Sequence, residues 1–123
     1  MNKRIIISAA VFGALAVVLG AFGAHALKDM LIESGRLDTY ELAVRYQFYH
    51  TLSLLAVGIL MKENTSKFLS YSAWGFLIGC ILFCGSLFLL CFTGITILGA
   101  VTPFGGVAFI AGWVFLFLGI TRK

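Results

Sequence analysis

The side chains of this sequence best suited to chemistry in an apolar setting are two histidines and a glutamine. His25 follows a long hydrophobic run, and Gln47 and His50 lie in the segment YQFYH, residues 46–50. Polar and ionisable side chains are costly at membrane depth, which makes them candidates for function. Helical spacing places Tyr46, Gln47 and His50 on one face. Histidine titrates near physiological pH, so such a face could bind a ligand or pass protons.

A glycine-rich turn near the C-terminus adds backbone groups to this candidate site. Thr102 precedes the only proline and is followed by the pair Gly105 and Gly106. A helix N-terminus presents free amides and partial positive charge, and glycines let another group approach the backbone closely. Because these segments are expected at the same membrane face, we predict one polar cluster near the outer side. Its members are His25, Tyr46, Gln47, His50, Thr102, Gly105 and Gly106.

Two interpretations of this cluster stay open. Its side chains could only hydrogen-bond one another and the irregular backbone of the third loop, as polar groups inside a membrane must. They could instead form a binding site for a ligand or an ion, or a pathway for protons. Metal or haem ligation is not indicated, because two histidines lack a third strong ligand. A structure in which His25 and His50 lie apart would contradict the cluster.

Catalytic chemistry finds no support in the residue pattern. Hydrolysis or group transfer needs a nucleophile beside a base, or paired carboxylates in a cleft. Cys80, Cys84 and Cys91 share one helix face, but that helix carries no His, Asp or Glu, which favours a packing role. The acidic residues of the outer loop are interpreted as a solvated hairpin. We therefore predict no catalytic residue, no metal, no cofactor and no enzymatic activity.

The composition places these residues in a membrane. The chain has 123 residues, of which 61% are hydrophobic and 11% charged, whereas soluble domains average about a quarter charged residues. Its apolar runs approach the length of about 17 to 25 residues that a helix needs to cross a bilayer. No basic run interleaves with aromatic residues, so nucleic acid is not an expected partner. Membrane lipid is the expected surrounding of a single domain, residues 1–123.

The first apolar run has both ends of a secretory signal peptide. Lys3 and Arg4 imitate the basic region, and AHA, residues 24–26, imitates a small-x-small cleavage site. The run between them, residues 5–24, is longer than the usual apolar region of about 7 to 15 residues and fits a spanning helix. We expect a retained first transmembrane helix.

The helix signals predict an all-α membrane protein, a bundle of four transmembrane helices. Gly35 is suited to end the first helix, and Asp38 with Glu41 forms a capping-box pattern before the second. Thr102 as cap and Pro103 at the first helical position indicate the start of the last helix. The expected helices are approximately 5–33, 39–61, 68–92 and 103–120.

The basic residues predict that both termini are cytoplasmic. Lys and Arg in short loops favour the inside of the membrane. With the N-terminus inside, the inner side carries six basic residues: Lys3, Arg4, Lys62, Lys67, Arg122 and Lys123. The outer side carries three: Lys28, Arg36 and Arg45.

Small residues recur along one stripe of three of the helices. Since lipid is as apolar as leucine, membrane helices associate through close backbone approach, which small residues permit. We assign helix packing to Gly13, Gly20, Gly75, Gly79, Gly105, Gly112 and Gly119. A single four-helix protein needs fewer small-residue stripes than this for its own packing, if each stripe contacts only one neighbouring helix. A small-residue stripe left facing lipid would favour self-association.

Five motifs of the chain resemble one known family. They are GAFGAH (residues 20–25), YQFYH (46–50), GSL (85–87), TPFGG (102–106) and GW (112–113). Together and in this order they resemble the domain-of-unknown-function 423 family, also called uncharacterised protein family 0382, with animal relatives called transmembrane protein 256. The resemblance covers essentially the whole chain. It implies a small multi-pass protein of bacterial inner membranes with four spanning helices, and it implies no established activity.

The function favoured by these observations is that of a non-enzymatic integral membrane protein. It would act through helix packing, as a homo-oligomer or as an accessory subunit of another membrane protein. The alternative is a small oligomeric channel or transporter with a polar site near the outer face, formed by His25, Gln47 and His50. Proton-coupled export of the small multidrug type is disfavoured, because no carboxylate falls at mid-depth of the expected helices.

Overall fold

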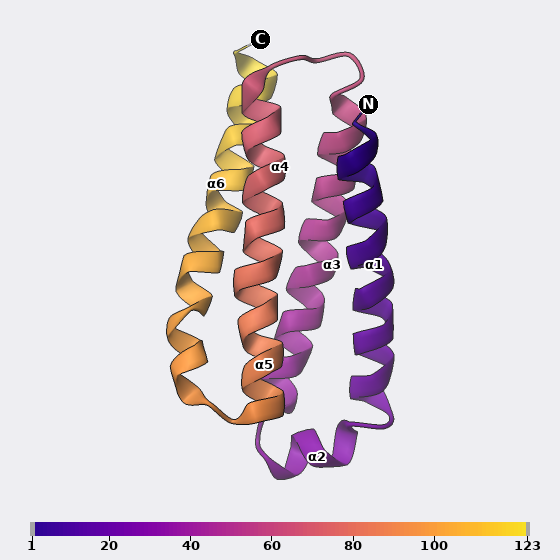
Figure 1. Ribbon diagram of the computed structural model, residues 1–123, viewed down its shortest axis with the longest axis vertical. Coiled ribbons are helices and arrows are strands. Elements are labelled where there is room, and N and C mark those ends of the chain that lie inside the picture. The colour runs from indigo at the N-terminus through magenta and orange to yellow at the C-terminus, as the bar shows by residue number, and fades with distance from the viewer. Residues whose placement is uncertain (1, 123) are drawn as a thin grey trace.

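The computed structural model describes residues 2–122, and every regular element in this range is a helix (Figure 1). This confirms the all-α prediction. The segments α4, η1 and α5 follow one another without interruption and form one long rod, in which η1 is a π-helical turn. The elements are α1 (Lys3–Ala24), α2 (Lys28–Glu33), α3 (Leu37–Leu60), α4 (Lys67–Gly79), η1 (Cys80–Cys84), α5 (Gly85–Thr93), the 3-10 helix η2 (Thr96–Ala100) and α6 (Thr102–Thr121).

The long helices lie side by side in an open layer, as Figure 1 shows. Helix α1 packs on α3, α3 packs on the α4–α5 rod, and the rod packs on α6. In a closed bundle the first and last helices would also meet. Here α1 and α6 occupy opposite edges of the layer; α1 packs mainly on α3, and α6 packs mainly on the rod and reaches α3 through aromatic side chains. The structure therefore arranges the long helices as a layer rather than as a closed bundle.

Three segments are long and apolar enough to cross a membrane: Lys3–Ala24, Lys67–Thr93 and Thr96–Thr121. Helix α3 is as long as these segments but does not reach the same hydropathy. Its polar side chains lower the average, yet several of them are buried inside the layer rather than exposed. Composition alone therefore understates how well α3 fits between apolar neighbours.

The single helix expected over residues 5–33 is wrong, because the structure divides it in two. Helix α1 ends at Ala24, and the backbone of His25 leaves the helical conformation with φ −125° and ψ −85°. The short helix α2 then crosses the end of the layer and buries Leu31 completely. Gly35 ends α2 in a left-handed conformation with φ +70°, as expected for a glycine at this position. The turn after α1 allows Leu31 to be buried, and this tertiary contact cannot be predicted from helical periodicity.

Two of the expected helix caps are also wrong. Helix α3 begins at Leu37, so Asp38 lies in its first turn, and the residue before the helix makes no side-chain cap. Helix α6 begins at Thr102 with the proline in its first turn, as expected. The Thr102 hydroxyl does not cap this helix and instead shares a hydrogen bond of 2.6 Å with the hydroxyl of Ser86. Interhelical contact thus replaces local capping at this end of α6.

Glycines bring the backbones of α4 and α6 into close contact. A Cβ added at Gly75 would lie 2.8 Å from the backbone nitrogen of Gly112, and one at Gly112 would lie 2.6 Å from the ring of Phe76. The Ser72 hydroxyl donates to the Gly112 carbonyl at 2.6 Å across the same interface. The same rod and α6 also meet closely at Gly79, Gly105 and Gly119.

The small residues of α1 meet α3 less tightly, with one exception. Cβ atoms added at Gly13 and Gly20 would lie 3.5 Å from Thr51 and 3.3 Å from Val44. Gly23, which the sequence analysis did not select, leaves room for the ring of Tyr40. All seven glycines assigned to packing have a neighbouring helix of the same chain beside them. These stripes are therefore used within one chain.

We expect Gly75→Ala to destabilise the protein and Gly85→Ala to be tolerated. The added methyl group at Gly75 would meet only backbone atoms of α6, which cannot move aside, whereas nothing lies within 4 Å of the same position at Gly85. Overpacking of this kind costs about 1 to 3 kcal/mol. Thermal unfolding of the two purified variants in detergent measures the difference. Equal melting temperatures would contradict the close α4–α6 contact.

Candidate functional site

His50 is buried in the middle of the layer, and both of its ring nitrogens are occupied. Its Nδ1 lies 2.8 Å from the carbonyl oxygen of Tyr46, and its Nε2 lies 3.2 Å from the indole Nε1 of Trp113. An indole N–H only donates, so Nε2 must accept and the ring proton must sit on Nδ1. The two contacts therefore fix His50 as one neutral tautomer that links α3 to α6.

Aromatic rings surround His50 on the side facing the rod and α6. The His50 ring stacks on Phe109 with centroids 3.6 Å apart, and Tyr46 stacks on Phe83 at 4.8 Å. Phe83 and Phe109 contact each other at 5.4 Å, which joins the two stacks. We refer to this group as the central aromatic cluster; it comprises Tyr46, His50, Phe76, Phe83, Phe109 and Trp113. Among the described residues, the larger cavities are lined by other side chains.

Gln47 faces the opposite neighbour of α3. Its side-chain Nε2 donates to the Phe12 carbonyl of α1 at 2.8 Å, and its side chain is buried. One turn further along, Thr51 lies beside Gly13 of α1. Of the buried side-chain polar atoms in residues 2–122, the Thr51 Oγ1 is the one without a hydrogen-bond partner. Helix α3 therefore uses polar contacts in two directions, toward α1 and toward α6.

The structure does not bring His25 to His50. His25 is exposed just beyond the end of α1, where its backbone N–H donates to the carbonyls of Ala21 and Phe22. His50 lies more than three turns beyond the start of α3 at Leu37, about 20 Å along the helix axis from that end of the layer. The predicted convergence is therefore wrong for His25. His50 thus lies further from this end of the layer than expected.

The glycine turn reaches the central aromatic cluster only through Phe83. At Gly105 an added Cβ would overlap the Phe83 backbone, and at Gly106 it would lie 4.0 Å from the Phe83 ring. Thr102 contacts Ser86 instead of the cluster. The expected site thus separates into four parts: Tyr46 and His50 with their aromatic neighbours, Gln47 on the α1 side, His25 at the end, and the turn of Thr102, Gly105 and Gly106 against the rod. Ligand binding by these residues stays a prediction.

Sequence reasoning missed the partners of His50 on α6. Trp113 and Phe109 are four residues apart, so they share one face of that helix. An indole N–H inside a membrane needs an acceptor, and few side chains of this protein could supply one at mid-depth. The motifs YQFYH and GW could have indicated this hydrogen bond, because His50 in the first supplies the acceptor and Trp113 in the second supplies the donor.

Metal binding has no geometric support within the described chain. Residues 2–122 contain no group of three His, Cys, Asp or Glu side chains placed to hold a metal ion. Cys80, Cys84 and Cys91 are free thiols buried within the rod and its contacts. What this interior offers is hydrogen bonding and aromatic packing between helices.

Comparison with known proteins identifies related chains along nearly the whole sequence. Residues 19–106 match the family described as "Protein of unknown function (DUF423)". The chain is similar to a UPF0382 membrane protein of Staphylococcus saprophyticus, with 44% identity over 95% of this chain and 96% of the relative. A UPF0382 membrane protein of Staphylococcus epidermidis is 43% identical over 98% and 97%.

A more distant relative comes from another bacterial group. The UPF0382 inner membrane protein YgdD of Escherichia coli K12 is 37% identical over 98% of this chain and 92% of its own length. The comparison with solved structures found no match. The family resemblance and the membrane location inferred from the sequence are both confirmed by these relatives. We conclude that this chain belongs to the DUF423 family and is a multi-pass protein of the cell membrane.

Proposed function

We propose that this protein is a non-enzymatic membrane protein that acts by association of α1 with a second copy of the chain. It would cross the membrane four times, with both termini in the cytoplasm. The observation that carries the proposal is a second stripe of small residues on α1, exposed at the edge of the layer. Three features support it: the placement of α3, the bonding of interior polar groups, and the geometry of α1.

Helix α3 fits a fourth membrane span because Gln47, His50 and Thr51 are buried, while its charged side chains are exposed near its N-terminal end. Its 24 residues correspond to a helix of about 36 Å, which is long enough to cross the hydrocarbon core. The neighbouring helix α1, with 22 residues, is of similar length. Gln47 and His50 are buried and bonded to α1 and α6. Polar residues with partners inside the protein are tolerated at membrane depth. A four-span topology leaves both termini on one side, the side with more basic residues.

The interior polar groups support a structural role rather than catalysis or transport. His50 uses both ring nitrogens, and the Gln47 amide donates to the backbone of α1. Protonation of His50 at Nε2 would require loss of the Trp113 hydrogen bond. A general base or a proton carrier needs a nitrogen that is free to exchange its proton. The histidine that was the best candidate for function is therefore occupied in holding helices together.

Helix α1 has two faces of small residues, and only one meets α3. The inner face contains Ala9 and Ala16, both buried. The other face is exposed and has alanine at spacings of four, seven and three residues; helical geometry places these within a sector of about 80°. Its residues are Ala10, Ala14, Ala21 and Ala24. Small residues at such spacing permit close helix contact in lipid, so α1 presents a second packing face at the open edge.

A second copy of the chain is a partner that this face would fit. Two copies in one membrane are parallel, so a twofold axis along the membrane normal would pair the two α1 helices with the same residues opposite each other. Ala14 would then lie near its counterpart. Leu15 and Val18 lie outside the alanine stripe, whereas the exposed Val17 lies within its sector, between Ala14 and Ala21. Close approach is therefore expected at the alanines on either side of Val17.

Cysteine cross-linking tests this contact directly. We expect Ala14→Cys to form a disulfide-linked dimer in native membranes at least several-fold more readily than Leu15→Cys. Both positions are exposed on α1, but Leu15 lies outside the alanine stripe. The three native cysteines are buried and are present in both variants, so they serve as a common background. Equal cross-linking at the two positions, or none at Ala14→Cys, would overturn the proposed association.

Reporter fusions test the four-span topology. We expect a fluorescent protein that folds only in the cytoplasm to be bright after the C-terminus and after Glu63. A phosphatase that is active only outside should be active when fused after Gly35. If α3 did not cross, the residues on the two sides of it, Gly35 and Glu63, would report the same side. That result would contradict the proposed number of spans.

The His50–Trp113 link is tested by a double-mutant cycle. His50→Phe leaves the indole N–H without an acceptor in lipid, and Trp113→Phe leaves Nε2 without a donor, so each should lower the free energy of unfolding. The double variant should lose less than the sum, by about 0.6 kcal/mol or more, the average for hydrogen bonds between membrane helices. Thermal unfolding in detergent measures the cycle, with Trp74→Phe at an exposed tryptophan as control. Additive losses would show that the two rings are not coupled.

A further inference from the structure

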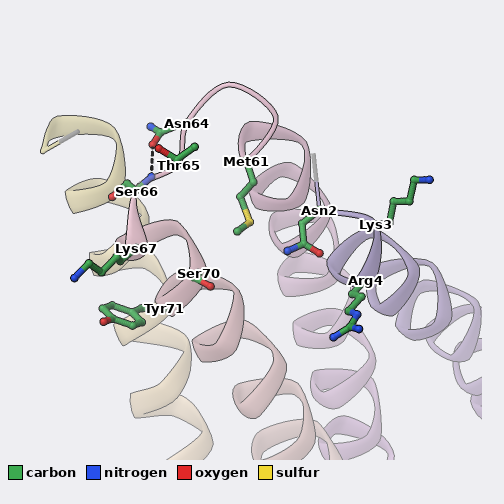
Figure 2. Close-up of a pocket in the computed structure, with 10 residues that line it drawn as sticks. All are labelled: Asn2, Lys3, Arg4, Met61, Asn64, Thr65, Ser66, Lys67, Ser70 and Tyr71. Atoms are coloured by element: carbon green, nitrogen blue, oxygen red, sulfur yellow. Dashed lines mark hydrogen bonds between the residues drawn. The ribbon is translucent and has the colours of Figure 1, made fainter.

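A hollow of about 800 Å³ opens at the end of the layer that holds the N-terminus (Figure 2). One wall is the first turn of α1, and the other is the first two turns of α4. These helices do not pack against each other, because α3 lies between them and ends at Leu60. Met61 follows directly and also lines the hollow. The open layer therefore produces this space where its central helix stops.

Hydrogen bonds fix both walls of the hollow. The backbone N–H of Asn2 donates to the Gly58 carbonyl at 3.0 Å, which ties the N-terminus to α3. On the other side, the Asn64 side chain accepts from the Ser66 backbone N–H at 2.9 Å and donates to the Gly119 carbonyl at 3.0 Å. The loop is thus held toward α6 and does not fold across the gap. The hollow is a defined feature of the fold rather than a loose loop.

The charges around this hollow are of one sign. Lys3, Arg4 and Lys67 line it, and within residues 2–122 no acidic side chain does. Figure 2 shows Asn2 and Arg4 on the side of α1 that faces α4, while Lys67 starts from the α4 wall and its ammonium group points away from α1. The Asn2 Oδ1 accepts from the Ile5 backbone N–H at 3.3 Å, so its amide N–H groups are left as donors. These are donors suited to an anion.

The opposite end of the layer shows that this charge pattern is not general. Its basic residues, Lys28 and Arg36, belong to a segment that also carries Asp29, Glu33 and Asp38. At the end with the hollow, the loop carries one carboxylate, Glu63, which lines the neighbouring cavities rather than this one. Arginine binds phosphate through a planar fork of N–H donors, and lysine adds charge at the rim.

We propose that the hollow lined by Arg4, Lys67 and Asn2 binds a phosphate group, carried either by an anionic phospholipid or by a free phosphate compound. The inference rests on the proposed membrane-spanning arrangement, because the hollow lies at the ends of α1 and α4, where lipid headgroups meet the protein. Basic recesses between spanning helices on the cytoplasmic side are typical sites for anionic headgroups. Ser70 supplies a hydroxyl group on the α4 wall. The lipid arm and the free-phosphate arm are separated by experiment.

The test measures lipid preference of the purified full chain by native mass spectrometry. The probes are phosphatidylglycerol and phosphatidylcholine, which differ in headgroup charge. We expect the wild type to retain phosphatidylglycerol about thirtyfold better, the value for two basic residues near a headgroup. The double variant Arg4→Gln with Lys67→Gln should lose this preference. The control, Arg45→Gln with Lys28→Gln, removes one exposed arginine and one exposed lysine outside the hollow and should keep it.

A variant that keeps every charge separates the recess from general attraction. Ser70→Trp fills the hollow from its α4 wall and should also abolish the preference. If millimolar inorganic phosphate displaces phosphatidylglycerol and raises the melting temperature without lipid, the site accepts free phosphate; if it does neither, the ligand is the lipid headgroup. No preference in the wild type, unchanged preference in Ser70→Trp, or equal loss in the control pair would overturn the proposal. Intact cross-linking of Ala14→Cys with no lipid preference would reject this site alone.

Discussion

Lipid supplies no hydrogen bonds, so polar side chains between membrane helices depend on partners within the protein. Helix α3 carries most of these side chains, and its central place in the layer follows from that need. Gln47 donates to the backbone of α1, while His50 accepts from Trp113 of α6 and donates to its own helix. A helix with polar groups on two sides requires a neighbour on each. The same side chains that lower the hydropathy of α3 therefore hold the layer together.

Close contact between the rod and α6 completes this arrangement. Glycines on both helices let the backbones approach, and the Ser72 hydroxyl bonds across the interface. The π-helical turn η1 lies where Gly105 meets the Phe83 backbone, so the widened turn and the missing side chain face each other. The ring of Phe83 in turn stacks on Tyr46 in the central aromatic cluster. Backbone packing and aromatic stacking thus share one interface.

An open layer leaves features that a closed bundle would hide. Helix α1 has one long neighbour, so its second small-residue face is free at the edge. The end of α3 leaves α1 and α4 separated, and the basic hollow lies between them. Both proposed interactions, with a second copy and with a phosphate group, use these open places rather than the interior. The interior itself is occupied by contacts that stabilise the fold.

The sequence by itself determined the membrane setting, the helical class, the approximate position of each long helix and the family. Apolar length, glycine and proline signals and motif order are local properties, which is why they could be read without a structure. Three outcomes required the tertiary structure: the first helix ends at Ala24 and α2 buries Leu31, His25 lies far from His50, and Trp113 is the partner of His50. These outcomes depend on which helices are neighbours. Periodicity predicts which residues share a face of one helix, but it does not predict which other helix that face contacts.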